Sequence, residues 1–83
     1  MVVQYWEKPV DLDLGGIGNR RTITATCFAC ECLLTLWPEQ HGPAHRRALA
    51  VCLDAMNGKV PQSAARRAFV EAAAEADLLT EVG

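Results

Sequence analysis

Apolar and polar residues alternate with a period of two near the start of the chain, in WEKPVDLDL. Val10 and Leu12 share one side of this segment, whereas Asp11 and Asp13 share the other. That period is typical of a half-buried β-strand. The segment GGIGN can form a turn, and RRTITA resumes the extended pattern, so we expect a β-hairpin. Because Pro9 has no amide hydrogen, the first strand should lie at a sheet edge or begin near Val10.

From Thr26 onward the period changes to that of a helix, with Ala29 and Leu33 on one apolar face. Thr26 can cap the start of this helix, because its hydroxyl can accept a backbone hydrogen bond there. Trp37 must leave the helical region, since the next residue is Pro38. We therefore expect the first helix to run without a break over residues 27–36.

Two more helices are predicted from turn residues and apolar periodicity. The second begins at Gly42 and Pro43, since proline suits the first turn of a helix, and it stops near Gly58. The third begins with Ser63 as its cap and runs to about Leu78, with an alanine-rich inner face. Those alanines should allow a close approach to a neighbouring helix.

Together these elements predict one α+β domain over residues 1–83. An N-terminal antiparallel β-hairpin would pack on three α-helices, and the terminal LLTEV could add a short third strand. With 51% apolar residues, the chain can build a core without disulfide staples.

Charge, hydropathy and the N-terminal residues indicate which kinds of partner and which cellular compartment to expect. The formal net charge of −2 argues against strong attraction to nucleic acid or to an anionic membrane. No apolar stretch approaches the ~20 residues that span a bilayer. The start MVVQYWEKPV lacks a basic region followed by an apolar one, so we expect the protein in the cytoplasm. Cysteines there stay reduced, which disfavours a disulfide framework.

The order of these features resembles a known family. The residues that carry the resemblance are Trp6 with the hairpin, Trp37-Pro38, Gly42, Ala48, Cys52, Gly58 and the segment RRAFVEAAAEADL. Over nearly the whole chain they look like the small bacterial proteins grouped as domain of unknown function 982. The resemblance implies a compact α+β domain without an assigned activity, and it brings no catalytic or binding residue with it. Cys52 falls where a family cysteine is expected.

The stretch CFACEC offers two chemical alternatives. Thiolate and imidazole ligands to zinc could come from Cys27, Cys30 and Cys32 together with His41, His45 or Cys52, and Cys27, Cys30, His41 and His45 are the set considered further. Cys27 and Cys30 could also act as a redox pair at a helix N-terminus, where a thiol is more acidic. Against a shared metal, Cys30 and Cys32 would lie about 160° apart around an α-helix. We therefore expect structural cysteines and no metal or cofactor.

The segment HGPAH does not match the metalloprotease motif, because no glutamate follows its first histidine. His45 falls on the apolar side of the second helix, so we interpret it as a partly buried, hydrogen-bonded structural residue.

Six of the eight basic residues occur as arginine pairs, including Arg46-Arg47 and Arg66-Arg67. Two such pairs brought together could contact phosphate or nucleic acid. Ten acidic residues and a lack of interleaved aromatics favour a solvated, salt-bridged surface instead.

The sequence thus predicts a small non-enzymatic interaction module that could form a homodimer or bind another protein. The expected contact surface consists of Trp6, Trp37, Arg46, Arg47, Arg66 and Arg67, with both tryptophans taken as exposed. A thiol-redox or metal protein using Cys27 and Cys30 is the alternative, and nucleic-acid or phosphate binding through paired arginines is a weaker one. We expect no membrane partner.

Overall fold

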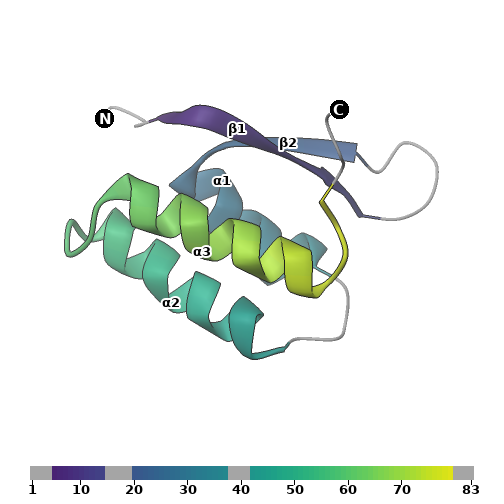
Figure 1. Cartoon of the computed structure of the whole chain (residues 1–83). Coiled ribbons are helices and arrows are strands. Elements are labelled where there is room, and N and C mark those ends of the chain that lie inside the picture. Colours follow the sequence, from purple (N-terminus) through teal and green to yellow (C-terminus); the bar gives the residue numbers. More distant parts are fainter. Residues whose placement is uncertain (1–4, 15–19, 38–41, 80–83) are drawn as a thin grey trace.

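The computed structural model describes residues 5–14, 20–37 and 42–79. Within these residues the chain forms two strands, three α-helices and a π-helical turn, shown in Figure 1. They are β1 (Tyr5–Asp13), β2 (Arg20–Ala25), α1 (Thr26–Glu31), η1 (Cys32–Leu36), α2 (Pro43–Met56) and α3 (Gln62–Glu75). The expected α+β arrangement of a hairpin with three helices is confirmed.

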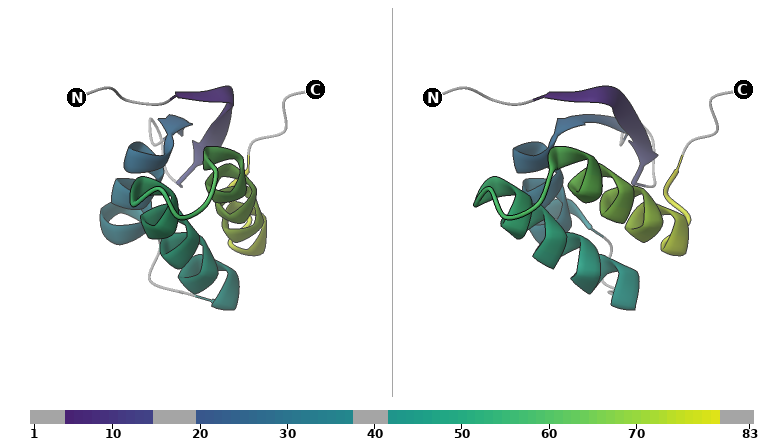
Figure 2. Two further views of the ribbon diagram at one scale, coloured as in Figure 1. Left: turned by 90° about the vertical axis from the view of Figure 1, so that its left-hand side faces the viewer. Right: turned by 60° about the vertical axis from the view of Figure 1, so that its left-hand side comes forward.

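The molecule has a hairpin layer above a helical layer (Figures 1 and 2). β1 and β2 pair antiparallel, with Val10 opposite Ile23 and Leu12 opposite Arg21. The alternation of the sequence holds, because Val10 and Leu12 are buried whereas Asp11 is exposed. α2 and α3 lie side by side beneath the strands, and α1 follows β2 directly.

The register of the hairpin shifts between Tyr5 and Val10, in the part of β1 that contains Pro9. Both strands are edges of a two-stranded sheet, as the proline suggested. The GGIGN loop lies outside the described residues. At the C-terminal side, Asp13 N donates to Leu78 O at 2.8 Å and Leu12 forms a bridge with Leu79. The rest of the expected third strand also lies outside the described residues.

The first helix differs from the prediction at both ends. Ala25 occupies the N-cap position, so the assignment of Thr26 as the cap was wrong. The Thr26 side chain is instead buried and bonded to other elements. Residues 32–36 are π-helical, so the expected unbroken α-helix is also corrected. Trp37 leaves the helical region as predicted, with ψ of 144°.

The π-helical turn leaves the carbonyl of Leu33 in need of a donor. In a π-helix this carbonyl would accept from the residue five positions on, but residue 38 is a proline without an amide hydrogen. The ring nitrogen Nε2 of His45 lies 2.9 Å from Leu33 O. The buried His45 therefore completes the end of the first helix from α2.

The second helix has the predicted boundaries, with Gly42 as N-cap and Pro43 in the first turn. It ends at Met56 with Asn57 as the C-cap, and Gly58 has the positive φ of 77° that glycine tolerates. The third helix begins one residue after Pro61, so Ser63 is not its cap. It ends at Glu75, before the predicted Leu78.

Phe69 lies at the centre of the core and is fully buried. Its ring centroid is 5.8 Å from that of Trp6 and 5.7 Å from that of Trp37. The helices pack against each other mainly through small residues, which are Ala48, Ala55, Ala65, Ala68, Ala72 and Ala73. Small side chains at these positions allow α2 and α3 to approach closely, as the sequence predicted.

Candidate functional site

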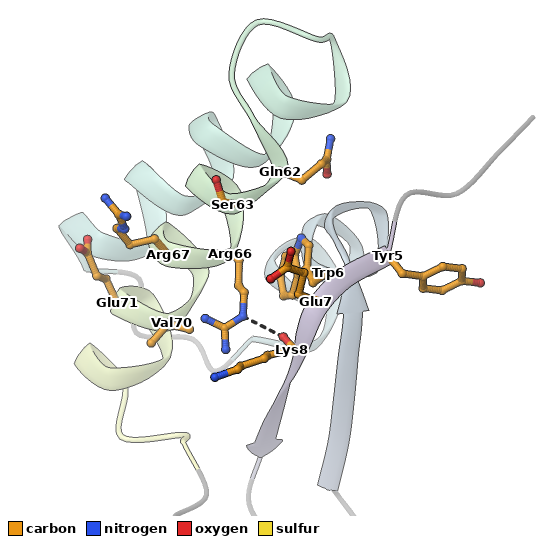
Figure 3. Close-up of a pocket in the computed structure, with 10 residues that line it drawn as sticks. All are labelled: Tyr5, Trp6, Glu7, Lys8, Gln62, Ser63, Arg66, Arg67, Val70 and Glu71. Carbon is orange, nitrogen blue, oxygen red and sulfur yellow. Dashed lines mark hydrogen bonds between the residues drawn. The ribbon is translucent and has the colours of Figure 1, made fainter.

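A groove of about 560 Å³ lies between β1 and the N-terminal half of α3 (Figure 3). This volume is in the range of sites that bind small ligands or short segments. The lining residues are Tyr5, Trp6, Glu7, Lys8, Gln62, Ser63, Arg66, Arg67, Val70 and Glu71. We call this feature the β1–α3 groove.

The groove is held in shape by a chain of hydrogen bonds at one end. Trp6 Nε1 donates to Thr26 Oγ1 at 3.0 Å, and the Thr26 hydroxyl donates to Gln62 Oε1. The side-chain amide of Gln62 then donates to Ala55 O at 3.2 Å. The chain links β1, α1, α3 and the last turn of α2, so the strand and the helix that form the groove have fixed positions.

Arg66 spans the space between the two walls of the groove. Its Nε donates to the backbone oxygen of Lys8 at 2.8 Å, across 58 positions of sequence. A guanidinium carries five N–H donors, so this contact leaves the terminal amino groups for other acceptors. Figure 3 shows the guanidinium of Arg66 and the side chain of Lys8 in the same space between strand and helix.

Charges of both signs surround the groove. Lys8, Arg66 and Arg67 are cationic, whereas Glu7 and Glu71 are anionic. Glu71 is also approached from outside the groove, because Arg47 Nη1 on α2 lies 3.6 Å from Glu71 Oε2. Both side chains are more than half exposed, so this ion pair adds little stability. It nevertheless offsets one of the two acidic charges.

The tryptophans are not the exposed anchors that the sequence suggested. Trp6 is 7% exposed and Trp37 is 8% exposed. The expected exposure was wrong because α3 covers the inner side of β1 and brings Phe69 against both indoles. Trp6 still lines the groove, but most of its ring belongs to the core.

The cysteines are free, and their thiols are buried except for the half-buried Cys27. Burial raises the pKa of Cys32 to about 11 and that of Cys52 to about 12. Burial, and secondarily the neighbouring Cys27, raises the pKa of Cys30. These three thiols therefore stay protonated near neutral pH.

Within the described residues, no group of three or more histidine, cysteine or acidic side chains is placed to hold a metal. His41 lies outside those residues. His45 is 5% exposed, which is more buried than the sequence suggested, and it forms the expected hydrogen bond, with Leu33 O as its partner. Its ring also packs against that of Trp37, with centroids 5.6 Å apart.

The structure brings some of the predicted arginines together. Arg66 and Arg67 line the groove, and Arg47 reaches its edge through Glu71. Arg46 is exposed on α2 and does not line the groove. Sequence reasoning missed Lys8 and Gln62, because their partners are far away in the chain and neither belongs to a recognisable motif.

Comparisons with known proteins identify one family and one similar solved structure. The family model described as "Protein of unknown function (DUF982)" matches residues 8–80. The NMR structure of Agrobacterium tumefaciens protein Atu1219 is similar, with a TM-score of 0.77 and 33% sequence identity. That match covers 100% of this chain and 89% of the other. No curated protein matches the sequence. Across the described residues, none of the helices has the length and apolar character needed to cross a membrane.

Proposed function

We propose that this chain, which belongs to the DUF982 family of proteins of unknown function, is a non-enzymatic interaction module that holds a partner protein in the β1–α3 groove. The observation that carries the proposal is the fixed bridge from Arg66 Nε to Lys8 O across an open groove. A rigid, mixed-charge groove can recognise a partner without any change in the fold.

The chemistry of the lining supports binding in preference to catalysis. Ser63 and Tyr5 carry the hydroxyl groups of the lining, and no histidine or cysteine accompanies them there. A serine nucleophile needs a base within about 3 Å. His45, the histidine of the described residues, is committed to Leu33 O in the core. Free cysteines suit a reducing compartment, which supports our placement of this function in the cytoplasm.

Site-specific photo-crosslinking in the native host tests the proposal. A benzophenone amino acid at Tyr5, which lines the groove and is 67% exposed, should capture a discrete partner. The same probe at Arg21, which is exposed on β2 and lies outside both the groove lining and the exposed apolar residues, is the control. The captured protein should then bind purified chain and lose affinity at least tenfold with Arg66→Ala. Equal products from both positions would contradict the proposal.

We infer as a second candidate that two copies associate through another surface. The observation is a set of large apolar side chains exposed on the adjoining elements α1, η1 and α2, which are Phe28, Leu34, Leu36, Leu53 and Met56. Exposed apolar residues of this size favour association when they adjoin.

Sedimentation velocity at tens of micromolar tests self-association. The wild type should show a dimer, and the double variant Leu34→Ser, Leu53→Ser should be monomeric. The groove variant Arg67→Ala, with its change on α3, should leave the dimer unchanged. A wild-type monomer over this concentration range would eliminate the second candidate.

A further inference from the structure

The geometry points to a specific occupant for the β1–α3 groove, namely a short extended peptide segment of another protein that carries carboxylate side chains. The inference rests on the proposed interaction function and adds the chemistry of the partner. Its carboxylates would bind Arg66 and Lys8, and the intervening side chains, which point to the other side of an extended segment, can be apolar.

Arg66 is the residue that is best arranged for a carboxylate. Its side chain is half-buried, and the bond from Nε to Lys8 O fixes the plane of the guanidinium. The two terminal amino groups can then form the paired, parallel hydrogen bonds that arginine makes with a carboxylate. Because the side chain is already ordered in the free protein, little conformational entropy is lost when the ligand binds.

The balance of charge in the groove favours an anionic ligand. Lys8 and Arg67 add two further cations to Arg66, whereas Glu71 is already approached by Arg47. Glu7 remains as the acid of the lining that forms no ion pair with another described residue. The groove is therefore locally cationic although the whole chain carries a formal charge of −2. At physiological salt, charges beyond about 8 Å are largely screened, so the local cations dominate.

The same lining favours a peptide over a nucleic acid. Glu7 and Glu71 flank the cations, and a continuous chain of phosphates would have to pass both. A peptide can place a carboxylate at Arg66 and an uncharged group beside Glu7. Alternation of this kind is easy for an extended peptide, since neighbouring side chains point to opposite sides.

Recognition should depend on side chains and not on strand addition to β1. Two backbone groups of β1 already form hydrogen bonds along its outer edge. Lys8 O accepts one from Arg66, and Asp13 N donates one to Leu78 O. Leu12 also forms its bridge with Leu79 on that side. An added strand would have to displace these contacts, so the guanidinium is the feature that selects the ligand.

Titration of three matched peptides by fluorescence anisotropy tests the inference. The probes are short labelled peptides in which leucine alternates with glutamate, glutamine or lysine. The full chain should bind the glutamate peptide at least tenfold more tightly than the glutamine peptide, and the lysine peptide most weakly. In ¹H–¹⁵N spectra, the glutamate peptide should shift Lys8, Arg66 and the Trp6 indole signal.

Variants in and outside the groove distinguish the effect of the paired N–H donors of Arg66 from the effect of its positive charge. Arg66→Lys keeps the charge but removes the paired donors, so affinity for the glutamate peptide should fall about tenfold. Arg66→Ala should lower it further. Arg46→Ala removes the same charge from the surface of α2 outside the groove lining and should change affinity less than twofold. Circular dichroism verifies that each variant is folded.

The outcomes distinguish this inference from the broader proposal. Equal binding of the glutamate and glutamine peptides in the groove would overturn the acidic ligand but leave the interaction module standing. Tighter binding of a thymidine oligonucleotide at Arg66 would overturn it in favour of a nucleic acid. Concentration-dependent shifts of Lys8 and Arg66 without peptide would assign the groove to a second copy. Failure of every peptide, together with a discrete crosslinked partner at Tyr5, would overturn only the ligand class.

Discussion

The hydroxyl of Thr26 is the residue-scale feature on which the groove depends most directly. It accepts a hydrogen bond from Trp6 Nε1 and donates one to Gln62 Oε1, and it is almost completely buried. A residue expected to cap one helix thus joins a strand to two helices. The capping prediction was reasonable for a threonine between a strand and a helix, but position in sequence does not show which partners the fold will supply.

Replacement of Thr26 by valine keeps the shape but removes both hydrogen bonds. Because the Trp6 N–H would be buried without a partner, we expect a loss of about 1–3 kcal/mol in the free energy of unfolding. For a domain of this size, each kcal/mol lowers Tm by ~4–8 °C. Thr35→Val is the matched control, since Thr35 is exposed and donates only to Glu31 O. A loss of equal size in both variants, measured by thermal denaturation, would refute the special role of Thr26.

The buried thiols make the stability of the protein sensitive to alkali. Burial, helped by the neighbouring Cys30, raises the pKa of Cys52 to about 12 from the ordinary value of 9.0. Above pH 9 the unfolded chain loses this proton while the folded chain keeps it, so folding is weakened as pH rises toward 12. Below pH 9 both states hold the proton, and the thiol contributes no pH dependence.

We therefore expect the free energy of unfolding to fall by up to about 1.4 kcal/mol for each pH unit above 9 through Cys52. Urea denaturation at a series of pH values measures this slope. Cys52→Ala should make the slope shallower, whereas Val51→Ala, a neighbouring change without a thiol, should leave it as in the wild type. An unchanged slope in Cys52→Ala would show that other titratable groups cause the loss of stability at alkaline pH.

At the scale of elements, α3 completes the start of α2. The carboxylate of Glu75, the last residue of α3, accepts a hydrogen bond from Ala44 N at 3.2 Å. A negative charge at this position also complements the helix dipole. Gly42 makes room for it, because a Cβ there would lie 2.1 Å from Glu75 Oε1. The backbone of Gly42 itself is ordinary, with φ of −85°.

A double-mutant cycle tests this contact between helices. Gly42→Ala should displace the Glu75 carboxylate and lower the free energy of unfolding by roughly 0.5–1 kcal/mol, as should Glu75→Ala. The double variant should lose no more than either single one, because both changes remove the same interaction. Strict additivity in urea denaturation would mean that the two residues act independently.

Sequence patterns predicted some of the helices and strands correctly but not all of them. Period-two alternation located β1, and proline with glycine located both ends of α2, because these signals depend on local backbone geometry. The π-helical turn was not predicted, since residues 32–36 have ordinary helix formers and the His45 nitrogen that binds Leu33 O comes from another helix. The β1–α3 groove was not predicted from the sequence for a similar reason. Arg66 was recognised as half of an arginine pair, but its contact with Lys8 depends on how α3 lies across β1.

At the scale of the whole molecule, Phe69 connects the hairpin with the opposite end of the helical layer. Its ring contacts Trp6 of β1 and also Trp37, which follows the first helix. A domain of this length has a stability of only about 4–12 kcal/mol. One central aromatic residue therefore accounts for a large fraction of the stability.

Phe69→Ala should lower the free energy of unfolding by about 3–5 kcal/mol and bring the protein close to its unfolding limit. Because both indoles pack on Phe69, tryptophan fluorescence and circular dichroism should report the same transition. Phe28→Ala, on the exposed side of α1, should change stability by less than about 1 kcal/mol. If the Phe69 variant were as stable as the Phe28 variant, the core would not depend on this contact.

The π-helical turn also has a consequence for how such a protein can change in evolution. A turn of this kind equals an α-helix into which one residue has been inserted. Deletion of a residue from 32–36 would restore regular α-helical pairing and change the position of the last carbonyls of the first helix relative to His45. A histidine would then have no reason to persist at the buried position on α2. Among members of the family, the length of the first helix and the residue type at position 45 should therefore be inherited together.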